Sequence, residues 1–428
     1  MSLGRTDPPH RARRARPRFL RRACAVVLLG LCLALPLGAH DPRAQGADPD
    51  IRLGYLLSRA GGFNTQDRAG ARMGEDELNV QADAVGKRFR VLFAEGGHSG
   101  EIVEQARMLI EKQGARALLG SVSPAATVAL AEFAQRQGVV FFNVGSEADS
   151  LRGENCRRNA FSIGPSLTMG VRALGQWALQ AKQWKAWAIV EGDSRGEGRL
   201  AEAARGYLKA HGGSVAGEVK LAEAAAHDPA QALQTLRALP ADFVFVALTG
   251  EKQELFLQAC QKAAIATPVG GSAPELVRIA RDTRHFAGYW STGWNHLNDI
   301  FGASELNNRF AAFAGIPMNE RGWGAWAGVK ILGEAILRAG TPDAAKLVPY
   351  LRGQMQFDGY MGASMNFRPW NHQLRQKMAI VRVNHDAVWN GWDALLPEAS
   401  VPLRQLKGWE GDPLDSIGFT AAESGCTF

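Results

Sequence analysis

Short apolar runs alternate with amphipathic stretches along the first part of this chain, a pattern typical of strands followed by helices. The order occurs three times, with an expected strand and helix start at 51–57 and Asp67, at 89–94 and Ser99, and at 117–120 and Ser123. In the helix after Ser99, Ile102, Ala106 and Leu109 fall on one face, opposite charged residues. This alternation predicts an α/β fold, in which helices cover both faces of a parallel sheet.

The alternation begins again after residue 166, which predicts a second unit of the same kind. Strands are expected near 186–190, 214–219, 243–247 and 268–270, with helices between them. A strong helical pattern at Trp326, Val329, Leu332 and Ile336 and a late strand at 378–383 indicate that the chain returns to both units. Two α/β lobes also suit a chain that is too long for one ordinary core.

The N-terminus has the pattern of a secretory signal peptide. A cluster of arginines precedes an apolar run at 24–35, and small residues at Ala39 and at 44–46 offer cleavage sites. The cluster consists of Arg11, Arg13, Arg14, Arg16, Arg18, Arg21 and Arg22. A short membrane anchor is the alternative, but about 20 apolar residues are needed to cross a bilayer. We expect residues 1–46 to direct export to the periplasm, by a Sec or a twin-arginine route.

Removal of this leader changes the charge of the protein. Residues 1–47 hold 9 of the 49 Lys and Arg and 2 of the 42 Asp and Glu, which leaves 40 residues of each sign. The basic excess therefore belongs to the leader. It gives no reason to expect a nucleic acid or a membrane surface as a partner.

Three cysteines follow the leader, and none has the CxxC or Cys/His spacing of a metal site, so we expect no metal or cofactor. Cys260 falls in an apolar helical pattern and is expected to be buried. Cys156 and Cys426 lie in polar, loop-like segments. In an oxidising compartment these two either form a disulfide that ties down the C-terminal tail or remain two free thiols.

Several segments resemble successive landmarks of the periplasmic leucine/isoleucine/valine-binding family, over about residues 51 to 383. They lie at 51–57, 70–79, 118–124, 141–146 and 161–166. Other segments are similar to a branch of that family associated with pyrroloquinoline quinone-dependent alcohol oxidation. Those segments lie at 292–296, 357–359, 366–376 and 422–426.

The resemblance implies the type I periplasmic binding protein fold, with two lobes of parallel sheet and flanking helices joined by three crossovers. We place the crossovers near 163–166, 290–294 and 355–360. The first lobe is then expected at 51–164 plus 293–357, the second at 165–292 plus 358–396, and a tail at 397–428. The implied function is that of a monomeric substrate-binding protein, which closes around a small polar solute and is recognised by an ABC permease.

Two loops of the first lobe are expected to hold the solute. Ser123 followed by Pro124 is typical of an N-cap and a first helical residue, and a helix N-terminus favours an anion. In the family, the matching loops bind the carboxylate of the ligand. The resemblance therefore implies binding roles for Ser121, Ser123, Asn143, Gly145 and Ser146. Simple capping explains Ser123 equally well.

The second lobe departs from the family pattern. An aromatic residue that the family places before a glycine is missing from 193–198, and the family acid that binds an amino group has no clear match in 270–275. The expected contacts from this lobe are Asp193, Arg195, Thr249, Ser272 and Glu275. Glu275 equally fits a surface acid at a helix start. The solute class therefore stays open between amino acids, organic acids and alcohol-derived metabolites.

Enzymatic motifs are missing from the sequence. The segment 97–100 lacks the Gly-x-Ser-x-Gly spacing of a nucleophile elbow, and no stretch has the pattern of a P-loop. We therefore expect a binding protein rather than an enzyme. A soluble ligand sensor of the same fold is the alternative, because transport and sensing would leave the same sequence pattern.

Overall fold

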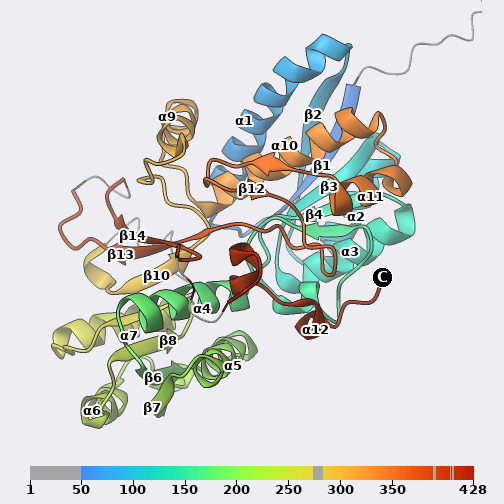
Figure 1. The fold of residues 1–428 in the computed structure, drawn as a ribbon. Coiled ribbons are helices and arrows are strands. Elements are labelled where there is room, and N and C mark those ends of the chain that lie inside the picture. The colour runs from blue at the N-terminus through green and yellow to red at the C-terminus, as the bar shows by residue number, and fades with distance from the viewer. Residues whose placement is uncertain (1–49, 273–282, 389–391, 405, 407–408) are drawn as a thin grey trace, which may run out of the picture. The chain divides into compact units, whose positions relative to one another are not determined.

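The computed structural model describes residues 50–272, 283–388, 392–404, 406 and 409–428. The expected signal peptide and Glu275 lie outside these residues. The described chain forms two large sheets with helices packed on them (Figure 1). Below, the N-terminal sheet and the elements packed on it are the first lobe, and the other large sheet with its helices is the second lobe.

The first lobe is built on a parallel sheet. Its strands are β1 (Asp50–Ser58), β2 (Arg88–Gly96), β3 (Ala115–Ser121), β4 (Val140–Asn143) and β5 (Ala160–Ser162), in the order β2-β1-β3-β4-β5. The connecting helices are α1 (Asn64–Ala82), α2 (Ser99–Glu111) and α3 (Pro124–Gln137). The predicted alternation of strand and helix is confirmed, although α1 begins at Asn64, before the expected Asp67.

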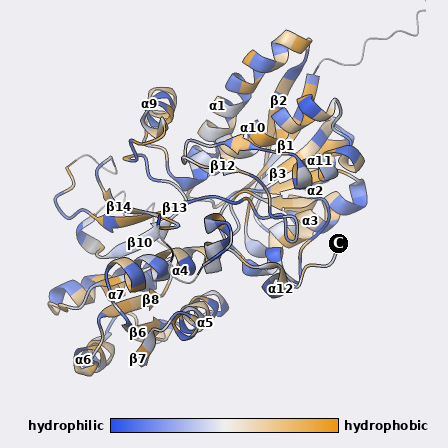
Figure 2. Ribbon diagram, viewed as in Figure 1, coloured by the Kyte–Doolittle hydropathy of each residue, from blue (hydrophilic) through white to orange (hydrophobic). Residues whose placement is uncertain are grey.

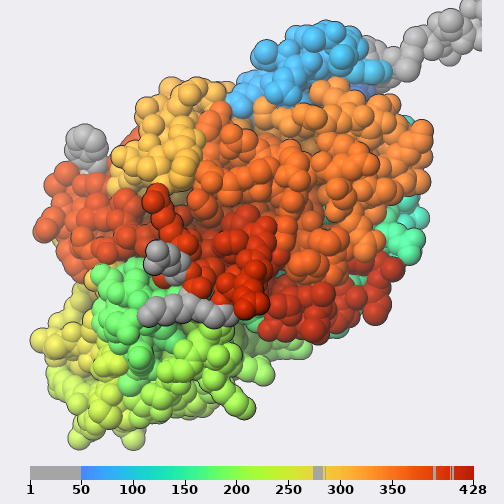
Figure 3. Space-filling view, in the orientation of Figure 1, coloured from blue at the N-terminus to red at the C-terminus, as the bar shows by residue number. Residues whose placement is uncertain are grey.

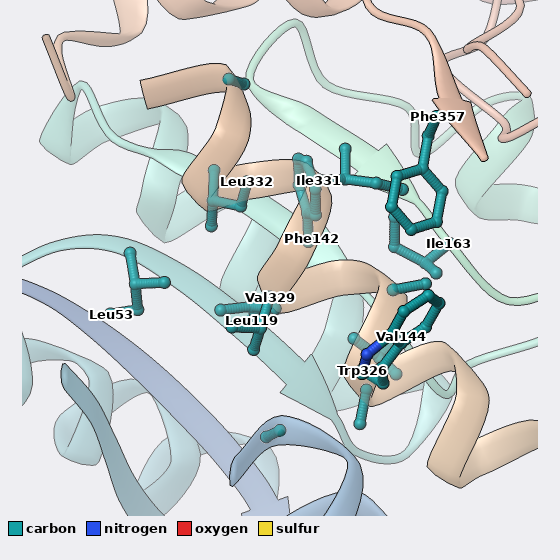
Figure 4. Close-up of a cluster of buried hydrophobic side chains, with 14 of the residues drawn as sticks. Leu53, Leu119, Phe142, Val144, Ile163, Trp326, Val329, Ile331, Leu332 and Phe357 are labelled. Atoms are coloured by element: carbon teal, nitrogen blue, oxygen red, sulfur yellow. The ribbon is translucent and has the colours of Figure 1, made fainter. Parts of the chain in front are cut away.

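The core of this lobe lies between the sheet and α10 (Glu320–Ala339), the late helix that the sequence predicts around Trp326. Figure 4 shows Val329 and Leu332 of α10 next to strand side chains from Leu53, Leu119 and Phe142. All five side chains are fully buried. Each burial of this kind stabilises the fold by about 1.5–3 kcal/mol, so the late helix is firmly attached to the early strands.

The second lobe also has a mainly parallel sheet. Its strands are β6 (Ala186–Glu191), β7 (Ser214–Lys220), β8 (Phe243–Ala247), β9 (Val269–Gly271), β10 (Tyr289–Thr292), β13 (Met378–Val383) and β14 (Leu395–Val401). They follow the order β14-β13-β10-β9-β8-β6-β7, with β13 antiparallel to both of its neighbours. The helices are α4 (Leu167–Gln176), α5 (Arg195–Ala210), α6 (Ala230–Ala238) and α7 (Gly250–Lys262). Figure 2 shows mixed hydropathy along these helices, as the amphipathic pattern predicts.

The chain passes between the lobes at three places. Ile163 belongs to the first core and Met169 to the second, and the chain returns between Trp290 and Trp294. The last passage lies between Leu374 of the first core and Met378 of the second. These extended passages are the three crossovers of the type I periplasmic binding protein fold.

The lobe boundaries of the structure differ from the expected ones after residue 357. The segment 358–374, expected in the second lobe, contributes Met361, Met365 and Phe367 to the core of the first. The reason is a small hairpin of β11 (Phe357–Asp358) and β12 (Ser364–Met365), whose Gly359 carbonyl accepts a hydrogen bond of 3.1 Å from the indole of Trp323. The first lobe also holds α9 (Ala303–Ala314) and α11 (Ala344–Gly353).

The C-terminal segment 412–428, which we call the tail strap, contacts both lobes. It contains a 3₁₀ turn at Pro413–Ile417 and the short helix α12 (Ala421–Ser424). Ile417 packs in the core of the second lobe, and Cys426 forms a disulfide with Cys156 of the first, with the two Cα atoms 5.9 Å apart. Figure 3 shows this C-terminal part of the chain on the surface, next to residues of both lobes. The strap is therefore a fourth connection, in addition to the three crossovers.

Candidate functional site

A cavity of about 500 Å³ opens where residues of both lobes meet. The first lobe contributes Val122 and Pro124 at the start of α3 and the loop 145–150 after β4. The second lobe contributes Leu167 at the start of α4 and Arg195, Gly196 and Arg199 at the start of α5. The remaining lining residues, Glu154 and Asn155, follow the same loop.

Three helices begin at this cavity, and each beginning is fixed by a serine cap. Ser123 accepts a hydrogen bond from the amide of Ala126, and Ser166 accepts one from the amide of Met169. Ser194 forms a capping box with Glu197 at the start of α5. Because the N-terminal end of a helix carries a partial positive charge, the three starts favour negatively charged or hydrogen-bond-accepting groups near the cavity. Ser123 itself is the cap, while its two neighbours line the cavity.

Gly145 and Ser146 lie on the cavity wall, in a loop that Asn143 holds in place. The side-chain amide of Asn143 donates to the Ser146 carbonyl and accepts from the Ser146 amide, both at 2.8 Å. The Ser146 side chain is only 3% exposed, and its hydroxyl has no hydrogen-bond partner among the described residues. A buried hydroxyl without a partner is costly, so this group would gain from a hydrogen bond to a solute atom that reached it.

Ser121 is buried behind the cavity wall and its hydroxyl is already bound. It donates to Oδ2 of Asp67 at 2.9 Å and accepts from Arg321, while the Tyr55 hydroxyl donates to Oδ1 of the same Asp67 at 2.9 Å. Burial raises the pKa of Asp67, opposed by the charge of Arg321. Arg321 also donates to the carbonyl of Gly145. A Cβ atom at Gly145 would lie 2.1 Å from a guanidinium nitrogen, so any other residue here would displace the Arg321 side chain. Ser121 therefore supports the wall from behind.

Asp193 and Thr249 belong to a network of charges in the second lobe and do not line the cavity. The Lys252 ammonium, 3% exposed, lies 2.5 Å from Asp193 and 2.9 Å from Glu197. The amide of Thr249 donates to Glu197 at 2.9 Å. The hydrogen bond from Lys252 lowers the pKa of Asp193 to about 2. The buried Glu197 holds two loops together, because it binds both Lys252 and the amide of Thr249.

Ser272 is buried against α4 rather than exposed in the cavity. A Cβ atom at Gly170 would lie 2.8 Å from the Ser272 Cβ atom, which shows how closely the two elements approach. Of the expected contacts from the second lobe, only Arg195 lines the cavity. Glu275 lies outside the described residues, as stated above.

Arg152, which the sequence analysis did not single out, is fully buried beside the first crossover. It donates to the carbonyl oxygens of Ser146, Ala148, Gly164 and Pro165 and to Oε1 of Gln373, at 2.6–3.3 Å. Burial lowers the pKa of this guanidinium to about 10, which leaves it charged at neutral pH. The residue therefore connects the cavity loop with the first and third crossovers.

The described residues include no group of three or more His, Cys, Asp and Glu side chains that could hold a metal ion. Among the same residues, no helix is both long and apolar enough to cross a membrane. The His, Asn and Trp residues of the segments 292–296 and 366–376 have structural contacts. His372 is stacked between the rings of Phe161 and Phe428, with ring centroids 4.2 Å apart on each side.

Two α/β lobes joined by three crossovers, with a cavity between them, define a two-lobed binding protein. The chain belongs to the periplasmic binding protein family, whose model matches residues 50–387. Membership implies a location in the periplasm. The family and the similar structures named below are solute-binding proteins and not enzymes.

Curated relatives match only part of the chain. The Leu/Ile/Val-binding protein homolog 7 of Brucella abortus (strain 2308) is 24% identical over 122 residues, which cover 28% of this chain and 31% of that protein. Homolog 8 of Brucella suis biovar 1 (strain 1330) is 24% identical over 130 residues, or 30% of this chain and 32% of that protein. The matched segment thus spans about a third of the length of these relatives.

The chain is also similar to solved structures, and each similarity covers nearly the whole length of the solved chain. A branched chain amino acid ABC transporter periplasmic ligand-binding protein from Burkholderia xenovorans LB400 has a TM-score of 0.78 at 19% identity, covering 87% of this chain and 98% of that one. The substrate binding protein LivJ of Streptococcus pneumoniae, in complex with isoleucine, has a TM-score of 0.66 at 15% identity, covering 82% and 98%. A Rhodopseudomonas palustris solute binding protein in complex with benzoate has a TM-score of 0.63 at 17% identity, covering 82% and 96%. These similarities establish the fold.

Proposed function

We propose that this protein is the substrate-binding component of an ABC transporter and holds a small organic solute in the cavity between its lobes. The observation that carries the proposal is the cavity itself, because residues of both lobes line it and the buried Ser146 hydroxyl there has no partner among the described residues. Two of the similar structures named above support it, since they are complexes with isoleucine and with benzoate.

The proposed mechanism is closure of the lobes around the solute. Three crossovers and the tail strap link the lobes. A solute that touches both lobes favours the closed form over the open one. The closed form is what an ABC permease would recognise. We further propose that the protein acts as a monomer, without a cofactor and without a nucleic acid partner.

The proposed export depends on the leader at residues 1–46. The exported protein is expected to begin between residues 40 and 48, which N-terminal sequencing of periplasmic protein would measure. An intact chain beginning at Met1 in the cytoplasm would contradict both the export and the oxidising environment of the cysteines.

A link to pyrroloquinoline quinone-dependent alcohol oxidation is the finer part of the proposal, and its support is the resemblance at 292–296 and 366–376. In the structure these segments are buried at the crossovers; for example, the Gln376 side chain donates to the Ile163 carbonyl at 2.7 Å. Their role in the fold is therefore structural and says nothing of the solute. Deletion of the gene should impair growth on an alcohol and not on succinate. Equal growth of both strains on several alcohols would remove the link.

The test of the binding site uses Ser146→Ala, with Ser214→Ala as the control on an exposed serine of the second lobe. Probes are L-isoleucine, L-leucine, benzoate and short-chain alcohols, measured by thermal shift and then by calorimetry. Loss of one hydrogen bond costs about 0.5–1.5 kcal/mol, so Ser146→Ala should weaken the best probe roughly twofold to tenfold. Unchanged affinity in Ser146→Ala, for every probe that binds, would place the site elsewhere.

A further inference from the structure

Glu147 lies at the point where the two lobes meet on the cavity. It follows Ser146 in the loop after β4, and its own carbonyl oxygen accepts a hydrogen bond of 2.9 Å from the amide of Leu167 at the start of α4. The side chain is half-buried and lines the cavity. A solute in this cavity would therefore meet the Glu147 carboxyl group.

The other carboxyl groups around Glu147 already have partners. Asp149 accepts hydrogen bonds from the amide and the hydroxyl of Thr168, at 3.1 and 2.9 Å. Glu320 accepts them from the hydroxyl of Thr292 and the amide of Gly293, at 2.8 and 2.7 Å. The carboxyl group of Glu147 has no hydrogen bond or ion pair to any residue in the described part of the chain. It is thus an acceptor that is still available.

The charged groups facing Glu147 do not supply a partner either. They are the carboxyl groups of Glu320 and Asp149 and the guanidinium groups of Arg321 and Arg152. Arg195 and Arg199 of the second lobe line the same cavity, and the Arg199 guanidinium lies 3.8 Å from the carboxyl group of Glu154. Arg321 is bound to Ser121 and Gly145, and Arg152 to the carbonyl oxygens and the Gln373 amide oxygen described above. Burial and the neighbouring Glu320 raise the pKa of Glu147 to about 8. The charges of Arg321 and Arg152 therefore compensate the ionised form only in part when the cavity holds no cation.

A cationic amine supplies what this site lacks, because it brings a positive charge and several hydrogen-bond donors. Ser146, directly before Glu147 in the same wall, has a hydroxyl that is buried and has no partner among the described residues, and a small shift of the loop on binding would bring it to the solute as a second acceptor. We propose that the solute carries a protonated amine that binds between the Glu147 carboxylate and the Ser146 hydroxyl. This assignment rests on the proposed function, and it makes Glu147 the residue that selects amines over plain carboxylic acids.

The assignment has a consequence for protons. Below pH 8 the carboxyl group of the empty site is mostly protonated, and binding of an ammonium group requires its ionised form. Binding should then release a proton, and affinity should rise about tenfold per pH unit between pH 6 and 8 before it levels off. A solute without an amine should show neither effect.

Matched probes test the assignment on the complete exported protein. The first set is L-leucine, 3-methylbutylamine, which lacks the carboxylate, and 4-methylpentanoate, which lacks the amine; the second is benzylamine and benzoate. Calorimetry at pH 6, 7 and 8, in two buffers with different ionisation enthalpies, measures affinity and proton release together. Glu147→Gln removes the charge at constant size, and Glu202→Gln on the exposed face of α5 is the control.

The expected result is that members with an amine bind and release a proton, and that Glu147→Gln weakens them at least tenfold at pH 8 while Glu202→Gln does not. Glu147→Gln without solute should melt no lower than the wild type, since glutamine resembles the neutral acid. Tighter or equal binding of 4-methylpentanoate or benzoate, weakened by Ser146→Ala, would overturn the amine assignment and leave solute binding intact. Failure of every probe to bind would overturn both.

Discussion

The contact between α1 and α10 allows a prediction whose size follows directly from the structure. Gly70 of α1 faces the backbone of α10, and a Cβ atom there would lie 2.1 Å from the carbonyl oxygen of Gly322. Ordinary contacts of a Cβ atom lie at 3.4–4 Å, so the two helices would have to separate by more than 1 Å. Overpacking of this kind costs about 1–3 kcal/mol, which exceeds the gain of roughly 0.5–1 kcal/mol from replacing a helical glycine by alanine.

Gly70→Ala should therefore destabilise the protein, and the same substitution at Gly206 provides the control. Gly206 lies inside α5, and a Cβ atom there would meet nothing within 4 Å. Gly206→Ala should thus stabilise the fold by about 0.5–1 kcal/mol. Urea unfolding and thermal melting of both variants measure the two shifts. If Gly70→Ala melts at or above the wild type while Gly206→Ala behaves as expected, the close approach of α1 to α10 is wrong.

Further predictions concern the cysteines and a buried histidine. Thiol titration of the denatured, unreduced exported protein, which lacks Cys24 and Cys32 of the leader, should find one free thiol, that of the buried Cys260, because Cys156 and Cys426 are paired; three thiols would contradict the pairing. Burial lowers the pKa of His372 to about 4, below the usual value near 6.5, so the unfolded chain takes up a proton first as the pH falls. Stability should therefore decline between about pH 6.5 and 4 by as much as about 3 kcal/mol, and His372→Asn should flatten this decline in melting curves recorded against pH.

The elements whose apolar residues recur at the regular spacing of a strand or a helix could be predicted from the sequence. The strands of the first lobe and the amphipathic α2 could be predicted because each buries residues at the spacing of a strand or helix. The cap at Ser123 could also be predicted, since Pro124 fixes the first helical position. The hairpin at 357–365 could not, because its strands have two residues each and show no period.

The features that could not be predicted from the sequence are mainly charged residues whose hydrogen-bond partners lie far away in the chain. Arg152 and Arg321 lie in polar segments, where an arginine is normally solvated, and both are largely buried because distant carbonyl and hydroxyl oxygens surround them. Ser121 was expected to bind the solute, but its hydroxyl is occupied by Asp67, 54 residues earlier in the chain. Partners so far apart in the chain cannot be predicted from the residues that surround each one. The one available signal was the position of Arg152 shortly after the expected loop at 143–146, which places a charged side chain near the expected site.

The loop after β4 connects the cavity with the first crossover. This connection provides a route by which the proposed solute binding would favour closure of the lobes. Ser146 and Glu147 line the cavity, while Arg152, at the far end of the same loop, donates to the Ser146 carbonyl at 3.0 Å and to the Gly164 carbonyl of the first crossover at 2.9 Å. A solute that holds Ser146 in place would therefore also hold the Arg152 side chain that is bound to the Ser146 carbonyl. Because Arg152 donates to Gly164 as well, the position of the first crossover would be restrained too. Because buried guanidinium donors are costly to leave unpaired, these hydrogen bonds favour movement of the loop and the crossover together. The residues proposed to contact the solute and the first crossover are thus joined by a single buried side chain.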